Sequence, residues 1–516
     1  MRRNGENMIY STKEFYNFSD ILNYCADKFG EQDAFLQKRG TDTLRISYKD
    51  FLGRVKSVGV ALRKFGFEDK NVAVCGANCV EWCTGYLAAA IYCKNIVPAD
   101  KELPAADIMD ILHRSHAAAI ITDEKVYAKI KDSLEPHIRV IGMNFKADGV
   151  VSIADLWADD VAAPLPERDR DEPSVVLFTS GTTGRSKAVA LTQGNICSDI
   201  SSVMKTVILP TGGRIFSLLP LHHTYECNMA FLCCFSQGVT ICYGEKFTSI
   251  YRDIREFQPQ MLIVVPLMLE AFYKKIKPFI ETDKEKAMAL LGGKLKMIVC
   301  GAAMVDGETL AGFGALGLIP IQGYGMTECS PIIICNDDEF PNPASVGKPI
   351  PSAEVKIINT DENGIGELCV KGPMVTPGYY DDDDNLIDPR DEDGWFHTGD
   401  LGCYDDDGYY YITGRLKNVI VTPNGKNIYP EEIESKLTAY HEIKEALVYE
   451  GETELEASAV CAKIATDEDY DTIKAIVNEV NESNAPYKAI KAFTLCEELP
   501  KNSSHKIIRN NTNIRN

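Results

Sequence analysis

The apolar residues of this chain form short runs that alternate with segments of helical spacing. Residues 72–75, 118–122 and 260–265 are apolar runs of strand length. Each precedes a segment whose apolar positions recur every three or four residues, as in residues 82–92. Strands that alternate with helices in this way form a mostly parallel sheet with helices on both faces. The pattern therefore predicts an α/β fold for the first part of the chain.

The pattern changes between residues 347 and 413, where short strand-like runs are broken by Gly and Asp. We expect an antiparallel or barrel-like β-subdomain there, with a hairpin turn at Asp407-Gly408. A small α+β unit begins after residue 417. Because 516 residues are too many for one compact core, we expect two domains, residues 1–414 and residues 415–516.

Composition narrows the class of protein. A hydrophobic fraction of 45% and a charged fraction of 25% are typical of a soluble globular protein. No segment resembles a signal peptide or reaches the about 18 apolar residues of a transmembrane helix. The net charge of −21 argues against binding to nucleic acid or adhesion to an anionic membrane.

The 17 cysteines include no Cys-x-x-Cys pair. Cys75, Cys79 and Cys83 are spaced as on one helix face, which leaves a metal site as the alternative to chance. An odd cysteine count without a secretion signal indicates reduced thiols, so we expect a cytoplasmic protein. Peripheral association with a membrane stays open.

A segment of hydroxyl and glycine residues follows the strand-like run that ends at Phe178. Glycine lets backbone N–H groups approach an anion, and a closing lysine adds positive charge. The segment does not fit the Walker A pattern. We interpret it as a phosphate-binding loop, with a flexible linker as the alternative. Its residues are Thr179, Ser180, Gly181, Thr182, Thr183, Gly184 and Lys187.

The loop resembles that of the adenylate-forming (AMP-binding) superfamily, which includes acyl-CoA synthetases, luciferases and the adenylation domains of peptide synthetases. This chain has Ser186 and Ala188 where the family usually has proline and glycine. Further family motifs follow in the family's order. Residues 220–226 are especially similar to bacterial long-chain fatty acyl-CoA synthetases.

The second motif lies at residues 322–330. The Tyr324 ring can stack on adenine, and Glu328 offers a hard oxygen ligand for Mg²⁺. Alone, a Gly-Tyr-Gly turn would be an ordinary turn, but its place downstream of the first loop favours a nucleotide site. The resemblance assigns nucleotide contacts to Gln322, Gly323, Tyr324, Gly325 and Thr327. It also assigns them to Gly301 and Ala302, small residues that leave volume for a ligand, with ordinary packing at a strand end as the alternative.

Later motifs supply the remaining nucleotide contacts. The resemblance implies that Asp400 binds the ribose hydroxyls, that Arg415 contacts the nucleotide and that Lys417 is a hinge. Gly425 and Lys426 belong to a loop on the thiol side. The acidic residues behind Pro430 predict a helix that begins at this proline.

The last motif, residues 499–509, contains the lysine that drives adenylation in the family, here Lys506. Asn502 and His505 replace the usual Thr and Gly, and a solvated basic tail is the alternative. His222 and His223 suggest a metal, but neighbours on a strand point to opposite faces, so we expect no shared ion. The resemblance places His223 near the substrate carboxylate and the α-phosphate. The alternative is that His223 is a histidine of the structural core.

The resemblance implies a large N-terminal domain of two α/β subdomains plus a β-subdomain, and a small mobile α+β C-terminal domain. It implies an acid–thiol ligase that makes an acyl-adenylate from ATP, releases pyrophosphate, and passes the acyl group to CoA. We expect a medium- to long-chain fatty acid as substrate, and Mg²⁺ as cofactor.

Three alternatives stay open. The acceptor could be acyl carrier protein, although we expect no fused carrier domain. The acid could be an aryl or amino acid. As a protein of another class, the chain could be a nucleotide-binding regulator that has lost activity. The intact motif residues argue against this alternative: Lys187, Glu328, Asp400, Arg415 and Lys506.

Overall fold

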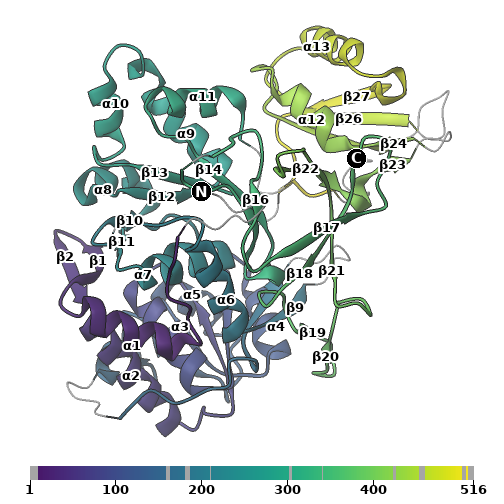
Figure 1. Cartoon of the computed structure of the whole chain (residues 1–516). Helices are drawn as coiled ribbons and strands as arrows, with labels where there is room; N and C mark the ends of the chain where they lie inside the picture. The colour runs from purple at the N-terminus through teal and green to yellow at the C-terminus, as the bar shows by residue number, and fades with distance from the viewer. Residues whose placement is uncertain are drawn as a thin grey trace. The chain divides into compact units, whose positions relative to one another are not determined.

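The computed structural model describes residues 10–157, 163–179, 186–209, 211–301, 305–339, 341–421, 426–451, 459–501 and 507–509 (Figure 1). Contacts divide the chain into two compact units. The first comprises Met1–Val355 and Val370–Phe396, and the second comprises Lys356–Cys369 and His397–Asn516. A domain boundary at residue 414 stays a prediction.

The first unit contains two nine-stranded sheets that are mostly parallel at their centres. In spatial order, the strands of one sheet are β16 (Lys348–Pro349), β15 (Ile332–Cys335), β14 (Ile321–Gly325), β13 (Met297–Cys300), β12 (Met261–Val264), β10 (Arg214–Phe216), β11 (Thr240–Tyr243), β1 (Asp33–Arg39) and β2 (Asp42–Ser47). Those of the other are β20 (Leu386–Ile387), β19 (Gly378–Tyr380), β9 (Lys187–Thr192), β8 (Pro173–Thr179), β4 (Asn95–Ala99), β3 (Asn71–Cys75), β5 (Ala117–Thr122), β6 (Arg139–Gly142) and β7 (Val151–Ser152).

Successive strand residues enter different cores because strand side chains alternate between faces. In β5, Ile121 belongs to the core between the two sheets and Ile120 to a core on the outer face. Strands buried on both faces are typical of sheets covered by crossover helices. The strands predicted at 72–75, 118–122 and 260–265 are confirmed as β3, β5 and β12.

Helices cover the sheets in three groups (Figure 1). The group between the sheets is α1 (Phe18–Phe29), α2 (Tyr48–Lys64), α3 (Val80–Tyr92) and α6 (Gln193–Val203). The group on the outer face of the first sheet is α8 (Ile250–Phe257), α9 (Pro266–Ile276), α10 (Lys284–Leu290) and α11 (Gly307–Ala315). The group on the outer face of the second is α4 (Ala105–Arg114) and α5 (Glu124–Ile130). The helix predicted at 82–92 is confirmed as α3.

Several short helices connect these elements. The 3₁₀ segments are η1 (Ile153–Leu156), η3 (Phe247–Ser249), η4 (Lys277–Phe279), η5 (Thr327–Cys329), η6 (Leu416–Asn418) and η7 (Pro486–Lys488). The π-helix η2 (Tyr225–Cys233) leads into α7 (Cys234–Ser236). Within the described ranges, no helix combines the length and apolar character needed to cross a membrane.

The second unit contains most of a four-stranded sheet, in the order β17 (Glu354–Ile358), β18 (Gly366–Lys371), β21 (Phe396–Tyr404) and β22 (Tyr410–Arg415). Its other strands are the pair β23 (Ile420–Val421) and β24 (Asn427–Ile428), and the sheet β25 (Glu445–Gly451), β26 (Ala459–Ala465) and β27 (Ala492–Cys496). Two helices, α12 (Pro430–Thr438) and α13 (Tyr470–Ser483), share a core with these strands.

Local predictions for this part are confirmed. Gly408, at φ 78°, closes the turn between β21 and β22, and its N–H donates to the Asp405 carbonyl. Pro430 occupies the first turn of α12. With two α/β sheets, a β-subdomain and a small α+β part, the expected fold class is also confirmed.

Candidate nucleotide and acyl site

The predicted phosphate loop connects two antiparallel strands of the second sheet. Thr179 ends β8 and pairs with Lys187 at the start of β9. Residues 180–185, which include Ser180, Gly181, Thr182, Thr183 and Gly184, lie outside the described residues. The apolar run after Lys187 is a buried strand. A phosphate loop anchored in a sheet requires such a strand, whereas a flexible linker does not require one.

Ser186, one of the departures from the family pattern, is held by Arg114 of α4. The guanidinium donates to the Ser186 hydroxyl at 2.8 Å and to its carbonyl oxygen at 2.9 Å. The same guanidinium lies over the Phe178 ring, 4.9 Å from its centroid. A proline would offer no hydroxyl, so this chain fixes the end of the loop by a side-chain contact instead. Nothing in the sequence pattern indicates the role of Arg114.

Lys187, Tyr379 and Glu328 lie together in the first unit although they are distant in sequence. The Lys187 ammonium lies 4.8 Å from the Tyr379 ring centroid, and the Tyr379 hydroxyl donates to Glu328 Oε1 at 3.0 Å. Tyr379 reaches this position because β19 pairs with β9, opposite Val189. Burial, aided by the Glu328 carboxylate, raises the pKa of Tyr379 well above its ordinary value, so the phenol keeps its proton and remains a donor.

Sequence analysis did not identify Tyr379. A Gly-Tyr-Tyr run at residues 378–380 indicates a strand, but nothing local indicates which strand it would join. The contact spans 51 residues of sequence. Only the sheet order brings the tyrosine to the lysine and the glutamate.

The Gly-Tyr-Gly segment is a strand with a tightly fitted turn behind it. Tyr324 in β14 pairs with Ile334 of β15, and the register shifts at Gly325. A Cβ atom at Gly325 would lie 1.8 Å from the Pro331 carbonyl oxygen, so only glycine fits there. The Met326 N–H donates to that same oxygen at 2.8 Å. The strand and turn therefore fix Tyr324, Thr327 and Glu328 on one short segment.

Glu328 suits the role of a magnesium ligand. The residue is 9% exposed, and its backbone carbonyl accepts the Thr376 N–H at 2.7 Å. One side-chain oxygen accepts from Tyr379, which orients the carboxylate. Mg²⁺ is commonly held by one or two carboxylates together with substrate phosphates, and a single buried carboxylate that is linked through Tyr379 to Lys187 matches that donor set.

The two histidines lie in a turn before η2, so the expectation that they are neighbours on a strand is wrong. Their rings lie in contact, with centroids 4.0 Å apart. Burial and the neighbouring His223 hold the pKa of His222 well below its ordinary value, so its 3.8 Å approach to Asp100 involves a neutral ring. The exposed His223 accepts the Cys227 N–H at its carbonyl oxygen.

Gly301 follows β13 and lies so close to Tyr225 that a side chain at this position would require Tyr225 to shift. A Cβ atom at Gly301 would lie 3.0 Å from the Tyr225 hydroxyl oxygen. Ala302 lies outside the described residues. Tyr225, the first residue of the π-helix, therefore packs closely against Gly301, and volume for a ligand beside the small residues stays a prediction.

The three helically spaced cysteines do not share one helix. Cys75 ends β3, Cys79 caps α3 and only Cys83 lies within it. The Cys83 thiol lies 3.0 Å from the Tyr243 hydroxyl, and the Cys79 thiol lies 3.9 Å from the Met143 sulfur. These contacts favour chance spacing over a metal site.

In the second unit, Asp400 and Arg415 are cross-strand partners on β21 and β22. Arg415 Nε lies 2.6 Å from Asp400 Oδ1, and Asp400 is 4% exposed. Lys417 lies in η6, where burial, with Arg415 and Arg509 nearby, lowers its pKa. A buried aspartate held by an arginine is a preorganised acceptor for hydroxyl groups.

The segments around the predicted thiol-side and catalytic residues are partly described. Lys426 lies with its ammonium 4.9 Å from the Tyr487 ring centroid, whereas Gly425 and Lys506 lie outside the described residues. Lys501 and Ile507 form a β-bridge on either side of the undescribed residues. The stretch that contains Lys506 therefore has its two ends joined.

Comparisons with known proteins show which family the chain matches. The family model described as AMP-binding enzyme matches residues 22–380, and the AMP-binding enzyme C-terminal domain matches residues 432–506. The chain is 29% identical over 467 residues to "Long-chain-fatty-acid--CoA ligase 6" of Mus musculus, covering 76% of this chain and 65% of that protein. It thus spans less than two thirds of the length of that relative.

A second relative is matched over nearly its whole length. It is the "3-[(3aS,4S,7aS)-7a-methyl-1,5-dioxo-octahydro-1H-inden-4-yl]propanoyl:CoA ligase" of Rhodococcus jostii (strain RHA1), 27% identical over 525 residues, covering 95% of this chain and 96% of that protein. Among solved structures, the anthranilate CoA ligase AuaEII in complex with anthranoyl-AMP superposes with a TM-score of 0.82 at 20% identity, covering 96% of each chain. At that identity the likeness shows the fold.

Proposed function

Because the chain belongs to the family of AMP-binding enzymes, we propose that it activates a carboxylic acid with ATP and transfers the acyl group to CoA. The acid attacks the α-phosphate to give an acyl-adenylate and pyrophosphate, and the thiol then displaces AMP to form a thioester. The observation that supports this most directly is the group formed by Lys187, Tyr379 and Glu328 beside the phosphate loop.

Each part of the site has a role in the first step. Lys187 and the N–H groups of the loop would bind the phosphates that leave, and Tyr324 would stack on adenine. Asp400 would accept from the ribose hydroxyls while Arg415 holds its carboxylate in place. Magnesium, held by Glu328, would neutralise phosphate charge. Lys506 would stabilise the negative charge that develops during attack.

The acid that we propose is a medium- to long-chain fatty acid. Similarity to a long-chain fatty acid ligase supports it, as do residues 220–226. The Rhodococcus relative acts on a bicyclic propanoate and the superposed structure on anthranilate, so a ring-bearing acid is the second candidate. We expect Tyr225, which packs against Gly301, to be one residue that discriminates between these candidates.

The test is pyrophosphate release from Mg·ATP over acetate, octanoate, palmitate, benzoate and several amino acids, with and without CoA. We expect release to be greatest with a fatty acid and to rise when CoA is present. Release with a fatty acid that CoA does not accelerate would indicate a carrier-protein acceptor. Release greatest with benzoate or an amino acid would replace the fatty acid proposal, and no release with any acid would contradict the ligase proposal.

A further inference from the structure

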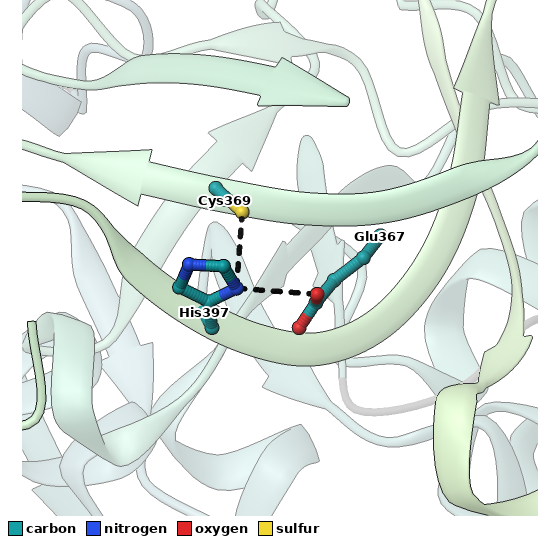
Figure 2. Close-up of side chains that lie close together, drawn as sticks. All are labelled: Glu367, Cys369 and His397. Carbon is teal, nitrogen blue, oxygen red and sulfur yellow. Dashed lines mark hydrogen bonds and ion pairs between the residues drawn. The ribbon is translucent and has the colours of Figure 1, made fainter. Parts of the chain in front are cut away.

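Glu367, Cys369 and His397 bring three metal-ligating atoms together in the β-subdomain (Figure 2). Glu367 and Cys369 are two residues apart on β18 and share one face of the strand, and His397 comes from β21 next to it. The ligand atoms lie within 4.8 Å of one another, the one such group in the described part of the chain. None of the roles proposed above uses them.

Both neighbours approach the same imidazole nitrogen. His397 Nδ1 lies 3.6 Å from Cys369 Sγ and 3.2 Å from Glu367 Oε2, and Figure 2 shows both contacts meeting at that atom. A ring nitrogen has either a hydrogen or a lone pair. With a hydrogen it can donate to the carboxylate but cannot accept the thiol proton. With a lone pair it can accept from the thiol but repels the carboxylate.

A cation would let all three atoms direct lone pairs at one point, whereas a hydrogen on Nδ1 can be shared only between a good acceptor, the carboxylate, and a weak one, the sulfur. Tetrahedral zinc, with its usual bond lengths to sulfur, nitrogen and oxygen, separates sulfur from nitrogen by about 3.6 Å and nitrogen from oxygen by about 3.4 Å. The observed distances are 3.6 and 3.2 Å. A thiolate and an imidazole also favour zinc over magnesium, which prefers oxygen ligands.

The surroundings are those of a site that keeps one position open. Glu367 Oε1 accepts the Gly399 N–H at 3.2 Å, which orients the carboxylate as an outer-shell partner does in metal sites. The Glu367 side chain is 12% exposed, whereas that of His397 is 40% exposed. Solvent or a small anion can therefore supply a fourth ligand from the His397 side.

We propose that Glu367, Cys369 and His397 bind a zinc ion that links β18 to β21. The thiol loses its proton on binding, so affinity falls as the pH is lowered. The ion would brace the strand that holds Asp400, three residues after His397. This site shares no residue with the proposed magnesium ligand Glu328, and its existence does not depend on the ligase activity proposed above.

The experiment is a titration of the metal-free full-length protein with Co²⁺, which takes tetrahedral zinc sites and gives a sulfur-to-cobalt charge-transfer band when a thiolate is bound. We expect one equivalent to produce the band and Zn²⁺ to displace it. Cys369→Ser should remove the band. His397→Gln should weaken binding at least about tenfold, since even outer-shell partners contribute that much.

Matched controls exclude other thiols and histidines. Cys403 and Cys496 are the partly exposed cysteines, and the rest are buried, so Cys403→Ser and Cys496→Ser should keep the band. His137, 3.4 Å from Glu135 at the surface, is the control histidine, and His137→Gln should leave affinity unchanged.

Three results would overturn the site: no band in the parent protein, loss of the band in a control variant, or unchanged affinity in His397→Gln. Cys369 is fully buried, so thermal unfolding must show that its variant folds. If that variant does not fold, the affinity of the His397→Gln variant tests the site, because His397 is exposed.

Discussion

Glu226 is a fully buried carboxyl group at the start of the π-helix, and burial raises its pKa from 4.5 to about 8. Its Oε1 accepts a hydrogen bond from the Ser217 hydroxyl, which only partly offsets the burial. Between pH 4.5 and 8 the unfolded chain ionises at this residue while the folded chain keeps the proton. Folding then takes up a proton, so stability falls as the pH rises through this window and levels off above it.

Glu226→Gln keeps an acceptor for Ser217 but cannot ionise. We expect its unfolding temperature to rise relative to the parent protein between pH 5 and 8, with a gain of up to about 1.4 kcal/mol for each pH unit. Thermal unfolding at a series of pH values measures this difference. Glu482→Gln, at an exposed position in α13, is the control and should show no such trend. A pH-independent difference for Glu226→Gln would show that the carboxyl group is ionised when folded.

A single hydroxyl group, that of Tyr379, positions the Glu328 carboxylate. Tyr379→Phe keeps the ring over which Lys187 lies but removes the donor to Glu328. A hydrogen bond to a charged group contributes about 1.5–3 kcal/mol, so we expect kcat/KM for ATP to fall by about tenfold or more, and the Mg²⁺ requirement to rise. Steady-state kinetics over a Mg²⁺ series tests both effects.

Tyr380→Phe is the matched control because its side chain points to the opposite face of β19 and packs in a different core. It should leave the Mg²⁺ dependence unchanged. Equal losses in both variants, or a lower kcat/KM for Tyr379→Phe with no change in the Mg²⁺ dependence, would contradict a positioning role for the Tyr379 hydroxyl.

At the scale of elements, the turn between β14 and β15 allows no side chain at Gly325. Gly325→Ala would place a Cβ atom 1.8 Å from the Pro331 carbonyl oxygen, so the two strands must separate. We expect a loss of several kcal/mol, in the range of overpacked interiors, together with loss of pyrophosphate release. Gly314→Ala in α11 meets open space and should gain about 0.5–1 kcal/mol. Thermal unfolding of the two variants measures this difference. Similar unfolding curves for both would contradict a requirement for glycine at position 325.

Elements could be predicted from sequence where burial alone determines them. The strands at residues 72–75 and 118–122 are apolar runs buried on both faces, and Pro430 begins a helix through its own backbone geometry. The π-helix could not be predicted, since residues 225–233 are buried almost throughout, Glu226 and Asn228 included, and show no distinguishing period. The expectation that the two histidines before it lie on a strand is wrong because both lie in the turn that leads into the π-helix.

At the scale of the whole molecule, the two-sheet fold and its order of motifs could be predicted, but not which distant strands become neighbours. Lys187, Glu328 and Asp400 lie within motifs that sequence analysis recognises. Tyr379 and Arg114 act through long-range strand and helix packing, which has no local pattern. The zinc ligands are similar, because Glu367 and His397 are 30 residues apart and meet only through the pairing of β18 with β21.

The final prediction concerns Lys506, which we propose stabilises the negative charge that develops during adenylation. Its flanks are fixed by the bridge between Lys501 and Ile507, and by Arg509, whose guanidinium donates to Glu434. Lys506→Ala should therefore fold normally while the rate of adenylate formation falls by about 100-fold or more, the usual loss of one transition-state donor.

Thioester formation from supplied acyl-adenylate and CoA should change far less, because that step does not need the charge on Lys506. Measuring the two half-reactions separately tests this difference. Lys491→Ala, which removes an exposed lysine from the same basic stretch, should leave both rates unchanged. Equal losses in both half-reactions would indicate a general role in folding or charge. If neither half-reaction slows in Lys506→Ala, Lys506 is not the catalytic lysine of this chain. The replacement of the usual glycine by His505 would then go together with a different catalytic group.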